Sequence, residues 1–147
     1  MNGEIVIREA TQPSTQLCDG INRLLRDLTS TPKEMDMARL TALLAWPGTH
    51  LYMAYESGRD CPVGMFSLAT TMMTTGCNVW LEDVVIAQNH QGRGFGKTLV
   101  ACAIERARAI CPGGRLVLTS RPSRLAANHI YSDLFVRKET NVYCLQL

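Results

Sequence analysis

The residues best suited to chemistry gather in one glycine-rich stretch, which runs from Gly92 to Thr98 and follows a β-branched segment and a short polar turn. Glycines at 92, 94 and 96 carry no Cβ atom, so the backbone can bend sharply and bring its N–H groups close to a phosphate oxygen. The first N–H groups of a following helix lack internal partners and carry partial positive charge. Arg93 and Lys97 add full positive charges. The stretch therefore predicts a binding site for a ligand with a pyrophosphate group.

Spacing excludes two common phosphate-binding motifs. The loop that binds nucleoside triphosphates needs a glycine five residues before Gly-Lys-Thr, and this chain has Gln91 there. The dinucleotide-binding pattern Gly-x-Gly-x-x-Gly would need a glycine at Lys97 or at Leu99. The pattern that does fit is Gln-x-x-Gly-x-Gly, filled by Gln91, Gly94 and Gly96.

Hydrophobic periodicity predicts the elements that must position this stretch. Short β-rich runs predict strands at residues 4–8, 50–56, 62–70, about 78–87 and 115–119. Apolar residues at helical spacing predict four helices, which start at Pro13, at Thr31 with a capping box to Glu34, after the glycine-rich stretch, and at Pro122. Val136 and the run 142–147 are expected to close the sheet with a final hairpin. We expect one α/β domain over residues 1–147, with a mixed central sheet in the order β-α-α-β-β-β-α-β-α-β-β and flanking helices.

Composition argues against several classes of partner. The formal net charge is +2 with both signs interspersed, which gives no case for nucleic acid or an acidic membrane. No 18-residue apolar run and no signal peptide pattern occur, so we expect a cytoplasmic protein. None of the six cysteines stands in a Cys-x-x-Cys pair. We therefore expect reduced thiols, with neither a metal site nor a disulfide framework.

Two motifs resemble those of the GNAT superfamily of acetyl-CoA-dependent N-acetyltransferases. The Gln-x-x-Gly-x-Gly pattern is similar to that family's coenzyme A pyrophosphate loop, and residues 118–131 look like its second signature, which ends in a tyrosine often used as general acid. The predicted element order matches the family fold over nearly the whole chain. The resemblance implies that the strands before and after the loop's helix splay apart around the pantetheine arm. It also implies acetyl-CoA as cosubstrate, no metal, and a homodimer.

The resemblance further implies which residues hold acetyl-CoA. Main-chain groups of Val84, Val85 and Ile86 would bond the pantetheine arm. The pyrophosphate would be held by Gln91, Gly92, Arg93, Gly94, Phe95, Gly96, Lys97 and Thr98. Many members carry an asparagine seven residues before the tyrosine, but this chain has Arg124, so either Asn128 or Arg124 would make that contact. After the tyrosine the family's Leu-Gly-Phe is replaced by Leu-Phe-Val at residues 134–136, which leaves no glycine to end the helix.

The implied reaction is direct attack by an amine on the thioester of acetyl-CoA. An alkyl amine with a pKa near 10.4 is about 3.4 units from neutrality at pH 7, which costs about 4 to 5 kcal/mol for the reactive form. A base that removes the ammonium proton is therefore useful. Glu82 and Asp83 are the candidates, acting directly or through a water, and strand alternation predicts that they point to opposite faces.

We favour Glu82 because alternation would place it on one face with Trp80, Val84 and Ile86. The Leu-Glu-Asp triplet at 81–83 also resembles that of polyamine and thialysine acetyltransferases, in which the glutamate position is implicated. The tyrosine of the second signature, Tyr131, would protonate the leaving thiolate, and a backbone N–H near Val85 would bind the oxyanion.

The competing function is a non-catalytic module that binds or senses acyl-CoA. The presence of both Glu82 and Tyr131 favours the enzyme. The acceptor stays open at the level of the sequence, since polyamines, amino acids, antibiotics and protein N-termini all carry a suitable amine.

Overall fold

A computed structural model describes residues 3–147 of the chain. The elements follow in the order β1 (Ile5–Glu9), α1 (Thr15–Leu28), α2 (Met37–Ala45), β2 (Thr49–Glu56), β3 (Pro62–Met73), β4 (Gly76–Ile86), the 3-10 helix η1 (Gln88–His90), α3 (Phe95–Ile110), β5 (Arg115–Val117) and α4 (Leu125–Leu134). This order confirms the predicted α/β fold as far as α4.

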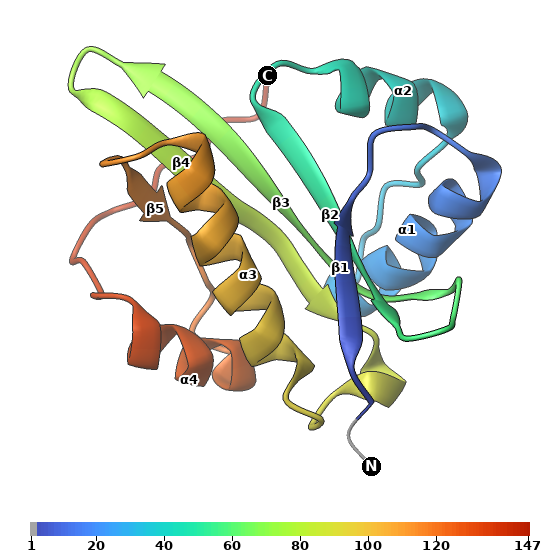
Figure 1. Ribbon diagram of the computed structural model, residues 1–147. Helices are drawn as coiled ribbons and strands as arrows, with labels where there is room; N and C mark the ends of the chain where they lie inside the picture. Colours follow the sequence, from blue (N-terminus) through green and yellow to red (C-terminus); the bar gives the residue numbers. More distant parts are fainter. Residues whose placement is uncertain (1–2) are drawn as a thin grey trace.

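The strands form one mixed sheet in the order β1-β2-β3-β4-β5. The first four strands are antiparallel, and β5 runs parallel to β4. Helices α1 and α2 lie on one face of the sheet, and α3 lies on the other with α4 beside it (Figure 1). The parallel pair β4 and β5 is joined through α3, which is the crossover that a parallel connection requires.

Each face of the sheet carries its own apolar core. Side chains on the α3 face, including Phe66 and Leu68, pack with Leu99 of that helix, and all three are fully buried. Side chains on the α1 face, including Met53, pack with Leu24. Because successive residues of a strand point to opposite faces, the two cores draw on alternate positions of the same strands.

The parallel strands separate halfway along β4. Strand β5 pairs only with Asn78, Val79 and Trp80, so the second half of β4 has no strand beside it on that edge among the described residues. This divergence agrees with the splayed arrangement that the resemblance implies. The carboxyl-terminal half of β4 leads directly through η1 into the glycine-rich loop and α3.

A β-bulge at Asp83 changes which side chains of β4 point to each face of the sheet. Between the register pairs Ser67↔Glu82 and Met65↔Val85, strand β4 contains one residue more than β3. Asp83 is that extra residue, with a φ of 54°, and a bulge reverses the alternation beyond it. Val84 and Ile86 consequently pack in the core on the α3 face, whereas Glu82 neighbours the buried Leu81 of that core and so points to the opposite face. The prediction that Glu82 shares a face with these two residues is wrong.

The second helix starts later than its sequence signals indicate. Its N-cap is Asp36, whose side chain accepts a hydrogen bond from the backbone N–H of Arg39 at 2.7 Å, and not Thr31. The side chain of Asn22 bonds both the N–H and the carbonyl of Met35, at 2.6 and 2.9 Å. These bonds from α1 hold the segment before Asp36 in a non-helical conformation, which the capping-box pattern alone could not reveal.

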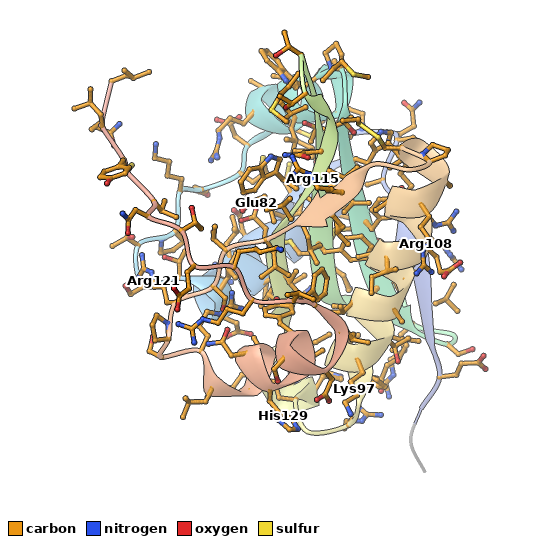
Figure 2. All side chains as sticks on the ribbon, turned by 90° about the vertical axis from the view of Figure 1, so that its left-hand side faces the viewer. Glu82, Lys97, Arg108, Arg115, Arg121 and His129 are labelled. Atoms are coloured by element: carbon orange, nitrogen blue, oxygen red, sulfur yellow. A yellow bond between two sulfur atoms is a disulfide. The ribbon has the colours of Figure 1, made fainter. Side chains whose placement is uncertain are left out.

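The predicted final hairpin is absent from the described residues. After α4 the chain forms no helix or strand through residue 147, and Figure 2 shows its last residues protruding from the body. The apolar side chains expected to form these strands are 72–108 % exposed; they are Val136, Val142, Tyr143, Leu145 and Leu147. Residues 137–139 are all charged, and no glycine follows α4 to end it. A two-stranded hairpin without packing partners is only marginally stable in water, which agrees with the absence of strands in this segment.

The prediction that all six cysteines are reduced is wrong for one pair. The sulfur atoms of Cys77 and Cys111 are bonded as a disulfide. The link joins the start of β4 to the residue that caps the end of α3, and these positions meet because β5 returns from α3 to pair with the start of β4. Cys18, Cys61, Cys102 and Cys144 are free. Among the described residues, no helix combines the length and apolar character needed to cross a membrane.

Candidate active site

The glycine-rich loop forms an open cradle at the start of α3. Gly92 and Gly94 have φ values of 76° and 83°, a left-handed conformation that favours glycine. A Cβ atom built on either residue would meet no atom within 4 Å, so open space lies in front of this backbone. Gly94 is the N-cap of α3 and supplies no capping side chain. The first N–H groups of the helix therefore stay available to an anion.

Two predicted loop residues shape this cradle through bonds within the chain. The side-chain amide of Gln91 donates a hydrogen bond to the carbonyl of Ile86 at 3.1 Å, which ties the loop back to the end of β4. The backbone N–H of Thr98 donates to the carbonyl of Gly94 at 3.3 Å, the first intrahelical bond of α3. Lys97 is exposed at the same helix end (Figure 2). Gln91 thus fixes the loop, and the exposed Lys97 places a positive charge beside it.

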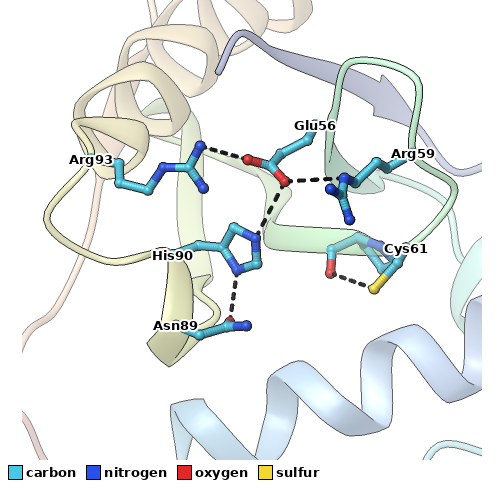
Figure 3. A network of polar contacts seen from close by, with 7 residues as sticks. Glu56, Arg59, Cys61, Asn89, His90 and Arg93 are labelled. Carbon is cyan, nitrogen blue, oxygen red and sulfur yellow. Dashed lines mark hydrogen bonds and ion pairs between the residues drawn. The ribbon is translucent and has the colours of Figure 1, made fainter. Parts of the chain in front are cut away.

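The side chain of Arg93 makes two contacts within the protein. Its guanidinium pairs with the carboxylate of Glu56 at 2.6 Å (Figure 3). The guanidinium carbon also lies 4.6 Å from the centroid of the buried ring of Phe95, in cation–π geometry. The charge of Arg93 is therefore already paired within the protein.

The structure places Arg124 and Asn128, the two candidates for the coenzyme A contact, in different surroundings. The guanidinium of Arg124 donates to the carbonyl of Val84 at 3.0 Å, across the gap where β4 has no strand neighbour. The side chain of Asn128 donates to the carbonyl of Arg121 at 2.9 Å and closes the turn before α4. Arg124 therefore contacts the segment at which the pantetheine arm is expected, and Asn128 stabilises the start of α4.

Tyr131 is buried on α4, with 8 % of its surface exposed. Its ring lies 6.0 Å from that of Phe135 in an edge-to-face arrangement. Burial raises the pKa of the Tyr131 hydroxyl above its usual value of 10.0, and the nearby charge of Arg124 opposes this rise. The hydroxyl is consequently protonated at neutral pH, which is the state that a general acid requires.

Glu82 and Asp83 form an acidic pair in β4. Both residues are exposed to solvent. Partial burial of the carboxyl group still raises the pKa of Glu82 above its usual value of 4.5, and the negative charge of Asp83 adds to the rise. Burial also raises the pKa of Asp83. A carboxylate with a raised pKa is a stronger base, so this pair is suited to accept a proton.

Sequence reasoning missed Glu56 and His90. His90 Nε2 lies 3.4 Å from Glu56 Oε2, whereas Arg93 pairs with the other oxygen of this carboxylate, Oε1 (Figure 3). No local pattern links the end of β2 to a loop more than thirty residues later, so only the fold could bring them together. Within residues 3–147, no group of three His, Cys, Asp or Glu side chains is arranged to hold a metal ion.

The fold thus combines an open glycine-rich loop at the start of α3 with a buried tyrosine on α4 and two carboxylates on β4. Comparison with known proteins shows to which family this fold belongs. The model of the acetyltransferase (GNAT) family matches residues 18–134. The chain belongs to this family.

Several solved structures share the fold. A putative acetyltransferase from Agrobacterium tumefaciens is 27% identical, with a TM-score of 0.80 over 96% of this chain and 99% of that one. An aminoglycoside acetyltransferase from an uncultured soil metagenomic sample is 17% identical, with a TM-score of 0.80 and coverages of 98% and 99%. Glucosamine-6-phosphate N-acetyltransferase from Arabidopsis thaliana is 16% identical, with a TM-score of 0.75 and coverages of 97% and 98%. None of the curated proteins compared with the chain matches it.

Proposed function

We propose that the protein transfers the acetyl group of acetyl-CoA directly to a primary amine. The observation that carries this proposal is the open cradle, in which the backbone at Gly92 and Gly94 faces empty space at an uncapped helix start. A pyrophosphate fits such a site because unpaired N–H groups and the helix dipole both favour negative charge. When bound, acetyl-CoA supplies the activated acyl group.

The chain's own residues divide the remaining work. Residues 91–98 hold the pyrophosphate, chiefly through backbone N–H groups and Lys97. Main-chain groups of Val84, Val85 and Ile86, with Arg124 beside them, line the gap for the pantetheine arm. Glu82 accepts the ammonium proton of the amine, directly or through a water, and Tyr131 gives a proton to the departing thiolate. The raised pKa of Glu82 makes its carboxylate a stronger base, which supports the first role.

Release of the coenzyme A thiol tests this function most simply. The purified protein is mixed with acetyl-CoA and with each member of a panel of primary amines, comprising a polyamine, free amino acids, an aminoglycoside and a peptide with a free N-terminus. We expect thiol release above the rate without amine for at least one class. Binding of acetyl-CoA with no turnover on any acceptor would instead support the acyl-CoA-binding module.

The location and assembly of the protein are further parts of the proposal. We propose a cytoplasmic homodimer, for which the family resemblance is the support. Exposed apolar side chains near the C-terminus, such as Tyr143 and Leu145 at 89 % and 84 % exposure, offer surface that an interface could cover. Light scattering coupled to size-exclusion chromatography measures the mass, and a mass near that of one 16.3 kDa chain would contradict the dimer.

Replacing Gly94 by alanine should weaken acetyl-CoA binding about tenfold or more. Alanine in the left-handed conformation costs about 1 to 2 kcal/mol, and its methyl group would stand in the open space that the pyrophosphate needs. Gly113→Ala is the matched control, since Gly113 has a φ of 77°, also faces open space, and lies just beyond the other end of α3. Isothermal titration calorimetry measures both, and equal affinities for the two variants would remove Gly94 from the cradle.

A further inference from the structure

One carboxylate at the end of β2 contacts two residues of the segment that forms the cradle. Glu56 Oε1 pairs with the guanidinium of Arg93 at 2.6 Å, and its Oε2 lies 3.4 Å from His90 Nε2 (Figure 3). Arg93 and His90 stand on either side of Gln91 and Gly92 in the loop. The carboxylate also reaches Arg59 at 3.6 Å on its own hairpin. Glu56 therefore contacts the residues on both sides of Gln91 and Gly92.

The contacts of Glu56 are sheltered from solvent. Its side chain is only 15 % exposed, and those of His90 and Arg93 are 19 % and 32 % exposed. The hydrogen bond and charge of Arg93 hold the pKa of Glu56 below its usual value, so the group is ionised at neutral pH. Such a half-buried, charge-assisted pair is stronger than an exposed surface ion pair.

A loop with this composition needs an outside support. Gly92, Gly94 and Gly96 give the backbone more freedom than other residues would, and this freedom must be lost when N–H groups converge on a phosphate. Fixing the loop beforehand lowers that cost and so increases affinity. Arg93 makes a second contact, because its guanidinium lies over the buried ring of Phe95. The contacts of Arg93 therefore connect the loop to both β2 and the core.

We propose that Glu56 is a positioning residue, which preorganises the pyrophosphate cradle by holding His90 and Arg93 in place. This inference rests on the proposed function, because it assumes that the cradle binds acetyl-CoA. It assigns Glu56 no contact with the ligand and no part in proton transfer. Its effect should therefore appear in affinity for the coenzyme.

Titration of coenzyme A into the Glu56→Gln variant tests the proposal. The amide keeps the shape of the side chain and removes its charge, and we expect the Kd to rise about tenfold. If the Glu56→Gln variant does not fold, Glu56→Asp replaces it in the test. This variant keeps the charge but shortens the reach of the side chain, so we expect a smaller rise in the Kd than for the amide. Glu105→Gln is the matched control, because it breaks the ion pair between Glu105 and Arg108, 2.9 Å apart on the exposed face of α3, and should leave the Kd unchanged.

A second comparison separates positioning from a general loss of stability. In an Arg93→Gln background the main partner of Glu56 is gone, so adding Glu56→Gln should raise the Kd by less than about threefold. Equal or tighter binding by the Glu56 variants, or a tenfold effect that persists without Arg93, would overturn the proposal. Absence of coenzyme A binding by the wild-type protein would overturn the proposed function itself, which keeps the two failures distinct.

Discussion

Replacing Tyr131 by phenylalanine is expected to lower kcat by roughly tenfold to ten-thousandfold while affinity for acetyl-CoA changes little. The substitution removes only the hydroxyl, and the ring that packs edge-to-face against Phe135 is kept. Because burial raises the pKa of this hydroxyl, the group carries its proton throughout the neutral range and can give it to a departing thiolate. Steady-state rates of thiol release, together with the Kd from calorimetry, measure the two effects separately.

Tyr143→Phe provides the matched control for this substitution. Tyr143 lies in the exposed C-terminal segment, with 89 % of its surface exposed, and loss of its hydroxyl should leave kcat unchanged. Wild-type turnover in the Tyr131→Phe variant would remove this tyrosine from the reaction and would shift proton delivery to a water or to another group.

Replacing Glu82 by glutamine is expected to lower kcat/KM for the amine by roughly a hundredfold to ten-thousandfold at neutral pH. The amide cannot accept the ammonium proton. In the wild-type protein the base must be ionised, so kcat/KM should fall as the pH drops through the pKa of Glu82. Burial and the charge of Asp83 raise that pKa above 4.5, so this acid limb should lie above the range of an ordinary carboxyl group. A pH profile of thiol release for the two proteins measures both the loss and the limb.

Asp83→Asn distinguishes the two carboxylates. Asparagine tolerates the left-handed backbone of the bulge, where φ is 54°, so the bulge should persist. Loss of the neighbouring negative charge should lower the pKa of Glu82 and move the acid limb to lower pH, with most of the activity retained. A large loss in Asp83→Asn together with near-normal rates in Glu82→Gln would instead assign the base to Asp83.

The cradle was accessible from the sequence because its signals are local. A β-branched strand, glycines at fixed spacing and an apolar-periodic helix lie within 81–110, and the structure places β4, the loop and α3 in that order. The mixed sheet followed from strand and helix patterns in the same way. Local backbone chemistry dominates in these elements, so their positions could be predicted closely.

Features that depend on distant contacts could not be predicted. The bulge at Asp83 reverses the facing of Val84 and Ile86 through one residue's backbone conformation, which alternation rules do not contain. The start of α2 is set by Asn22 on another helix. The apolar residues near the C-terminus are exposed and pack against no core among residues 3–147, so alternation alone is not enough to form strands there. Glu56 reaches the loop only because β2 ends beside it.

The most direct test of the account follows the backbone amides of the loop during titration with acetyl-CoA. Proton–nitrogen correlation spectra report each amide separately. If the cradle binds the pyrophosphate, the signals of residues 92–98 should shift in proportion to saturation, and those around the β3–β4 turn at Gly76, at the far end of β4, should stay in place. Unchanged loop signals at millimolar acetyl-CoA would contradict the account, as would shifts confined to another face of the protein.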